Sequence, residues 1–138
     1  MKTFIYFYFF IASTFLISNV EAANEVWETK IIPPWISPNG SLQAPMGYAI
    51  WYTLEFEKAA DGTLTGNVDI RSPQARCAGN AEFEYGSIKD GIIKIKSKPI
   101  PVPQCGYFYF QGKVEGDKWV GYIPWNSAKN EAIFTKSK

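Results

Sequence analysis

The side chains that most often do acid–base chemistry are scarce in this sequence. Histidine, the commonest general base, is absent. No Gly-x-Ser-x-Gly nucleophile elbow and no phosphate-binding loop is found. Two carboxylate pairs, Glu55 with Glu57 and Glu82 with Glu84, alternate with apolar residues, so we expect them on the solvent face of strands. The sequence therefore predicts a protein that is not an enzyme and needs no cofactor.

The two cysteines, Cys77 and Cys105, could in principle be nucleophiles, metal ligands or a disulfide pair. Without a histidine they lack both the usual base for a thiol nucleophile and the usual co-ligands of a zinc site. An even cysteine count in a small exported domain favours a bridge. We expect a Cys77–Cys105 disulfide and no metal site.

A second group of residues has the chemistry of binding. Arg71 and Arg76 are the only arginines, and their planar guanidinium groups suit a carboxylate or phosphate. Trp35 and Trp125 stand beside prolines in predicted connections, and Tyr107 points away from the predicted core. We expect these five residues to line a ligand site. Two simpler interpretations stay open, namely loop ion pairs for the arginines and a plug of the domain end for the tryptophans.

The N-terminus has the pattern of a secretory signal peptide. Lys2 precedes an apolar run over residues 4–17, and small residues precede a cleavage point after Ala22. We therefore expect residues 1–22 to be removed and residues 23–138 to form one secreted or periplasmic domain. An uncleaved anchor is the alternative. The formal net charge of +1 gives no basis for attraction to nucleic acid or to an anionic membrane surface.

The rest of the chain alternates apolar and polar residues with the period of two that is typical of β-strands. No window fits an amphipathic helix. The alternation predicts about eight strands, at residues 25–31, 47–57, 64–72, 81–88, 92–97, 107–115, 118–123 and 131–136.

The predicted connections alternate strictly between long and tight. The tight ones lie near Asp61-Gly62, Asp90-Gly91 and Gly116-Asp117, whose residues favour two-residue hairpins. In an antiparallel meander, alternate connections lie at the same end of the sheet. All long connections, and with them both cysteines, should therefore lie together.

This pattern predicts an all-β fold with about eight antiparallel strands in a small up-and-down β-barrel. Its strand count, tight turns and in-strand glycines resemble the architecture of the lipocalin and avidin group of small barrels. A two-sheet β-sandwich is the alternative, because strand alternation serves both architectures. The inward positions are expected to hold a mainly aromatic core formed by Tyr52, Phe56, Phe83, Tyr85, Phe108, Phe110 and Trp119.

Two functions follow as hypotheses. The first is an exported barrel that binds an apolar or amphipathic small molecule at its long-loop end. The second is a secreted protein-interaction or structural module with a filled core and no ligand, which contacts another exported protein. Asn39 begins an Asn-x-Ser glycosylation pattern, which applies only in a eukaryotic source.

Overall fold

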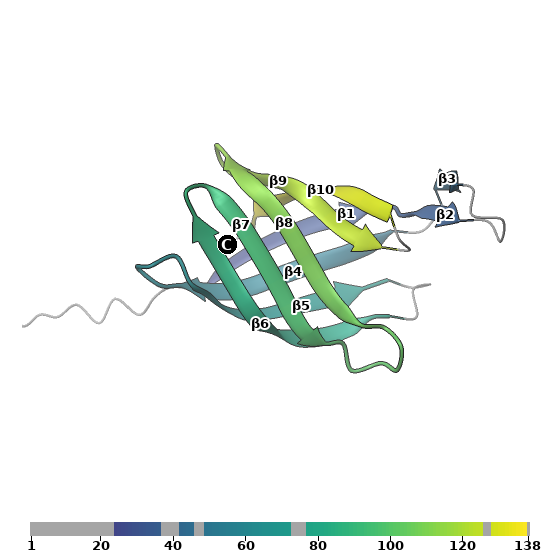
Figure 1. The fold of residues 1–138 in the computed structure, drawn as a ribbon, viewed down its shortest axis with the longest axis horizontal. Helices are drawn as coiled ribbons and strands as arrows, with labels where there is room; N and C mark the ends of the chain where they lie inside the picture. The colour runs from purple at the N-terminus through teal and green to yellow at the C-terminus, as the bar shows by residue number, and fades with distance from the viewer. Residues whose placement is uncertain (1–23, 37–41, 46–48, 73–76, 126–127, 138) are drawn as a thin grey trace, which may run out of the picture.

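The computed structural model describes residues 24–36, 42–45, 49–72, 77–125 and 128–137, and all its regular elements are β-strands (Figure 1). Eight of them form one closed antiparallel barrel. The predicted barrel is confirmed, and closure excludes the sandwich. These ranges contain no helix that could cross a membrane. The barrel strands are β1 (Glu25–Ile31), β4 (Ile50–Lys58), β5 (Leu64–Arg71), β6 (Gly79–Lys89), β7 (Ile92–Pro99), β8 (Tyr107–Glu115), β9 (Lys118–Trp125) and β10 (Ala128–Lys136).

Strand β1 closes the barrel because it pairs on both sides. Along one side it pairs with β4 over its whole length, with Trp27 opposite Leu54. Along the other side Trp27 lies opposite Lys136 of β10. The backbone amide of Ser137 also donates to the Val26 carbonyl at 2.8 Å, which extends the pairing beyond β10. The sheet therefore has no free edge for another chain to join.

The connection between β1 and β4 contains a short hairpin that the sequence pattern did not predict. Strands β2 (Pro34–Ile36) and β3 (Leu42–Pro45) pair antiparallel in a two-stranded sheet of their own. This region was expected to be an irregular long connection. Pro34 and Pro45, which lie opposite each other at one end of the pairing, obscured the strand signal, because proline lacks the amide proton that a ladder uses.

The tight and long connections lie at opposite ends of the barrel, as the meander requires (Figure 1). At the tight-turn end, the Asp61 carboxylate accepts a hydrogen bond from the Thr63 amide at 2.9 Å. The other end, which we call the mouth, carries the β2–β3 hairpin and the 100–106 loop. The connection between β9 and β10 is shorter than expected, because pairing runs to Trp125 opposite Ala128.

One predicted core residue faces solvent. Tyr85 is 46% exposed, whereas the alternation placed it inside the barrel with Phe83. The pairing of β6 with β7 shifts register between Phe83 and Tyr85, so the strand carries a bulge there. A bulge inserts one extra residue and reverses which positions face inward. Gly86 is buried as a result, and Tyr85 points outward.

Large aromatic side chains fill the interior near the tight-turn end. Trp27 and Trp119 stack with ring centroids 4.3 Å apart, and Phe56 stacks on Trp119 at 5.4 Å. Phe134 contacts the edge of Phe110 at 4.9 Å. Such ring pairs add about 0.5–1.5 kcal/mol each beyond their burial. This half of the barrel is therefore a packed core with no room for a ligand.

Inward glycines lie where neighbouring strands approach closely, and one of them lies against a core ring. A Cβ on Gly112 would lie 2.7 Å from the Phe110 ring and 2.9 Å from the Gly121 Cα. A Cβ on Gly121 would overlap the backbone of Gln111 and Gly112, and one on Gly66 would overlap the backbone of β4. Alternating large and small inward residues is how small barrels fill their interiors.

This packing predicts the effect of Gly121→Ala. The added methyl group meets backbone atoms that cannot rotate away. We expect the free energy of unfolding to fall by about 1–3 kcal/mol, measured by urea denaturation with the disulfide intact. Gly116→Asn is the control, because a Cβ there has open space and asparagine tolerates its φ of 63°. Equal losses in the two variants would contradict the packing explanation.

Candidate functional site

The mouth of the barrel contains a cavity of about 220 Å³. Core side chains at the mouth end of the barrel form its floor, and the 100–106 loop forms the wall on one side. The residues that line it are mostly apolar or aromatic, and none of the described ones is charged. They are Tyr52, Ile70, Cys77, Ile100, Gln104, Cys105, Tyr107, Phe108, Tyr109, Ile123, Pro124 and Trp125.

The 100–106 loop is held as a rigid wall by its own backbone. The Ile100 amide donates to the Gly106 carbonyl at 2.7 Å, and the Val102 amide donates to the Ile100 carbonyl at 2.7 Å. The Cys105 amide donates to the Val102 carbonyl at 3.2 Å. Gln104, which lines the cavity, has a φ of 67°, a conformation that a non-glycine residue adopts only when its surroundings impose it.

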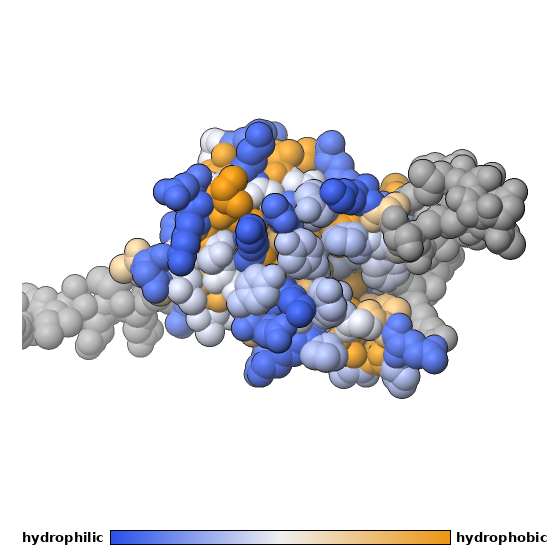
Figure 2. Space-filling view, viewed as in Figure 1, coloured by the Kyte–Doolittle hydropathy of each residue, from blue (hydrophilic) through white to orange (hydrophobic). Residues whose placement is uncertain are grey.

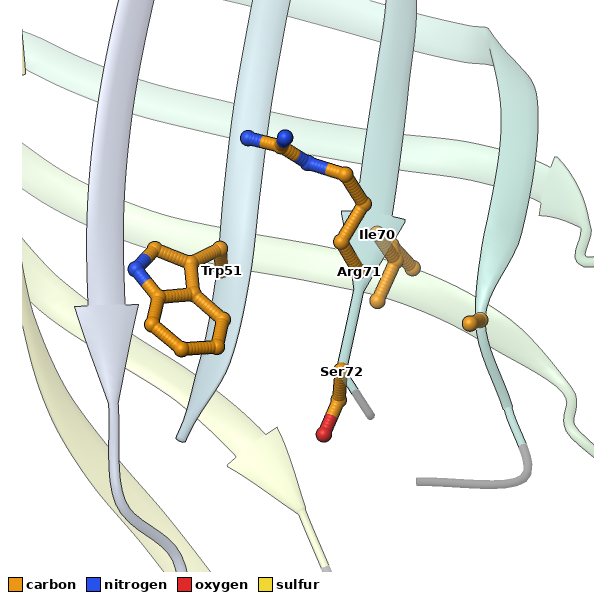
Figure 3. A pocket seen from close by; sticks show the side chains of 5 residues that line it. Trp51, Ile70, Arg71 and Ser72 are labelled. Carbon is orange, nitrogen blue, oxygen red and sulfur yellow. The ribbon is translucent and has the colours of Figure 1, made fainter. Parts of the chain in front are cut away.

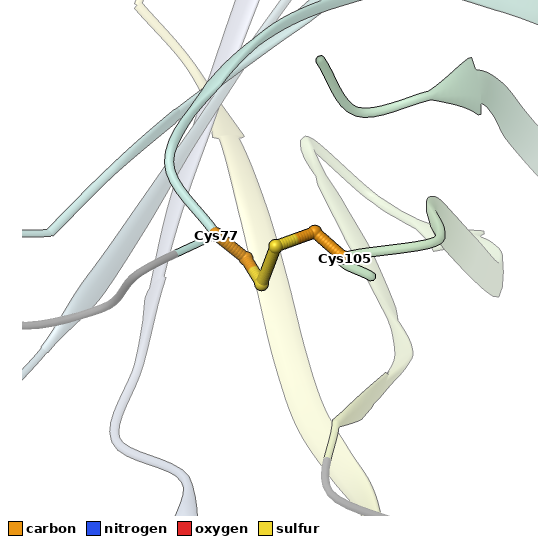
Figure 4. The surroundings of a disulfide bond; sticks show 2 residues. All are labelled: Cys77 and Cys105. Carbon is orange, nitrogen blue, oxygen red and sulfur yellow. A yellow bond between two sulfur atoms is a disulfide. The ribbon is translucent and has the colours of Figure 1, made fainter. Parts of the chain in front are cut away.

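A disulfide ties this loop to the start of β6. Cys77 and Cys105 are bonded, with their Cα atoms 5.4 Å apart (Figure 4). The predicted bridge is confirmed, and it joins two connections that the meander placed at the same end. Both cysteines line the cavity. The bridge is compatible with an oxidising, exported location.

A buried serine secures the base of the same loop. Ser97 is fully buried at the end of β7, where the pairing with β8 shifts register between Lys96 and Pro99. Its hydroxyl donates to the Lys98 carbonyl at 2.7 Å and accepts from the Phe108 amide at 2.8 Å. The side chain therefore supplies the hydrogen bonds that the irregular ladder lacks.

Tyr52 is the described residue of the cavity whose buried side chain has an unsatisfied polar atom. It lies on β4 with 1% of its surface exposed, and its ring packs 5.2 Å from that of Phe108. Its hydroxyl is buried and has no hydrogen-bond partner among the described residues. Burial raises the pKa of this phenol, so it keeps its proton at neutral pH.

The structure divides the five predicted binding residues. Tyr107 and Trp125 line the mouth cavity. Arg71 does not, because its side chain lies on the outer surface of β5 and pairs with Asp69 at 3.5 Å. Trp35 belongs to β2, whose side chains are not described, and Arg76 lies outside the described residues, as does Asn39.

Arg71 borders a second, external hollow of about 530 Å³ (Figure 3). Trp51 and Arg71 stand opposite each other on β4 and β5, with Ile70, Ser72 and Ala78 completing the lining. The exposed Arg71–Asp69 pair stabilises little by itself. Residues 73–76 lie outside the described residues, and we assign this hollow no function.

A cluster of tyrosines covers the outer face of the strands next to the mouth. Figure 2 looks onto this face, over β6, β7 and β8. Tyr107 is 54% exposed, and the Lys96 ammonium lies 4.5 Å from its ring centroid. Tyr109 donates to the Gln111 side chain at 2.8 Å. Burial, and then the neighbouring tyrosines, raise the pKa of Tyr109. We call Tyr85, Tyr107, Tyr109 and Tyr122 the tyrosine face.

The sequence pattern did not indicate that Tyr52, Ile100 and Gln104 line the mouth cavity. The alternation predicts Tyr52 only as a core residue. The available signal was that a tyrosine at an inward position among apolar residues needs a hydrogen-bond partner for its hydroxyl. Ile100 and Gln104 lie in a predicted loop, where alternation gives no indication of direction. Their roles depend on how the disulfide folds that loop over the mouth.

No family model, curated protein or solved structure matches this chain. Within the described ranges, no three His, Cys, Asp or Glu side chains come together as metal ligands. The site is therefore defined by its own geometry: a cavity at the open end of the barrel with no charged residue in its described lining, a disulfide-bridged wall and one buried hydroxyl without a partner.

Removing the disulfide should destabilise the 100–106 loop at the mouth more than the barrel strands. The bridge closes a loop with a sequence separation of 28. We expect a Cys77→Ser/Cys105→Ser variant to lose about 3.5 kcal/mol of stability. Its Ile100 and Val102 amides should exchange with deuterium faster, while those of β9 and β10 should change only by the global loss. Uniform acceleration across all amides would show that the bridge has no local role.

Tyr52→Phe should not destabilise the protein, because the lost hydroxyl makes no hydrogen bond. We expect the free energy of unfolding to stay the same or rise by about 1 kcal/mol. Tyr109→Phe, the matched control, removes a bonded hydroxyl and should cost about 0.5–1.5 kcal/mol. The raised pKa of Tyr52 favours folding only while the phenol is protonated, so its contribution is lost as the pH rises above about 10. Stability measured across that range should fall less steeply in Tyr52→Phe.

Proposed function

We propose that this protein binds an apolar or amphipathic small molecule in the cavity at its mouth. The supporting observation is that the cavity lies at the unfilled end of an otherwise packed barrel. Its described lining consists mostly of apolar and aromatic residues without charge, and tyrosines and Gln104 supply polar groups among them, as in many small-molecule sites. A preformed wall lowers the entropic cost of binding, and the bridged 100–106 loop provides one.

The cavity limits the size of the ligand. A cavity of about 150 Å³ accepts benzene, so by proportion about 220 Å³ accommodates roughly nine non-hydrogen atoms. A longer molecule would leave its remaining part at the rim, where Gln104 and Tyr107 are exposed. The rest of the interior offers no further depth, since Phe110 and Phe134 are fully buried beneath it.

The protein acts as an exported, non-catalytic carrier or sensor in this proposal. The apolar N-terminal run supports export, and the disulfide is consistent with an oxidising compartment. The described cavity lining has no nucleophile paired with a base, because its two cysteines are bonded to each other.

Blocking the cavity tests the proposal. Ile100→Phe places a larger side chain in the cavity, whereas Ile133→Phe, the control, enlarges an exposed side chain on the outer face of β10. In native mass spectrometry of protein purified gently from its own compartment, we expect a bound mass on the parent and the control. Ile100→Phe should lose it, since even an affinity loss of about tenfold empties the site during purification. A bare parent protein, or equal loading of both variants, would contradict the proposal.

The tyrosine face supports a second candidate function, a contact surface for another exported protein. Exposed tyrosines are enriched at protein interfaces because a rigid ring and a hydroxyl serve apolar and polar contacts together. Tyr85 and Tyr107 are the most exposed members. A bare protein in the experiment above would favour this function over the first.

A further inference from the structure

The chemistry of the cavity defines the kind of molecule that fits it. Tyr52 brings a phenol hydroxyl into an apolar setting where Ile70 and Phe108 are its neighbours in the lining. Leaving a buried hydroxyl without a partner is unfavourable, and nearly all such groups in folded proteins are paired. The missing partner is therefore the feature of this site that a ligand would supply.

Charged ligand groups are mismatched to the described lining. A carboxylate or phosphate entering it would lose its hydration and meet no Arg or Lys, since the described lining contains neither. An ammonium group would likewise meet no Asp or Glu. Arg71, the predicted anion contact, lies on the outer surface with Asp69.

We propose that the mouth cavity selects a neutral molecule whose apolar body carries a carbonyl or similar oxygen, which accepts a hydrogen bond from the Tyr52 hydroxyl. This inference rests on the proposed function. A protonated phenol is a donor, and a neutral carbonyl loses far less hydration on burial than an ion does. The selectivity would then come from one buried donor and from the absence of charge around it.

Three probes of similar size and shape test this selectivity: acetophenone, benzoate and cumene. Acetophenone carries a neutral carbonyl, benzoate is ionised at about pH 7, and cumene has no oxygen. Titration followed by the NMR signal of the Trp125 indole, which lies in the lining, reports binding at this site. We expect acetophenone to bind at least about tenfold more tightly than benzoate.

The Tyr52→Phe variant tests the contribution of the hydroxyl to binding separately from that of the cavity. We expect the variant to lose about 3- to 10-fold in affinity for acetophenone and to bind cumene as the parent does or slightly better. Tyr122→Phe should leave both affinities unchanged, because Tyr122 lies outside the cavity lining and its hydroxyl donates to the Gln111 side chain at 3.3 Å.

The outcomes separate the two proposals. If none of the three probes binds to the parent at the mouth, the proposed small-molecule function is overturned. If acetophenone and cumene bind but Tyr52→Phe affects neither, the cavity stands and the role of Tyr52 is wrong. If benzoate matches acetophenone, the selection for neutral molecules is wrong.

Discussion

Pairing of β1 with both β4 and β10 is the constraint from which the rest of the structure follows. Glu28 lies opposite Thr53 on one side and Thr135 on the other, so the first strand is held by strands close to it and far from it in the chain. A one-residue slip on either side would turn every inward side chain outward. Closure thus fixes the register of the whole meander and, with it, which side chains share the interior.

A closed barrel of eight strands has an interior that side chains nearly fill, and this one is filled unevenly. Trp27, Phe56 and Trp119 occupy the tight-turn half, where their rings stack on one another. The mouth half is lined by isoleucines and by Tyr52, and the space above them is bounded by a loop instead of more core. The cavity is therefore a product of where the large residues lie along the strands.

Much of this fold could be predicted from the sequence. Alternation placed all eight barrel strands, and the order of long and tight connections placed Cys77 and Cys105 at one end. The predictions were wrong where a local irregularity broke the period. The bulge beside Tyr85 reversed the facing of a residue that hydrophobicity alone assigns to the core. The β2–β3 hairpin was missed because its strands are short and contain prolines.

The candidate site was harder to predict because it depends on the path of a loop. Trp125 and Tyr107 were singled out as aromatic residues near the mouth, and both line the cavity. Gln104 lines the cavity and has a left-handed backbone conformation, which no pattern of residue types specifies. Arg71 was grouped with them by proximity in sequence, but the pleat of β5 turns it to the outside.

The start of β1 and the end of β10 lie at the same end of the barrel, and this determines how the molecule could be attached to a surface or to another protein. Glu25 begins β1 and Lys136 ends β10, and both lie at the tight-turn end, linked by an ion pair at 3.4 Å. A surface, fusion partner or tether attached beyond either residue would thus hold the barrel by its packed base. The mouth lies at the opposite end from such an attachment, so the molecule could be immobilised without its opening being obstructed.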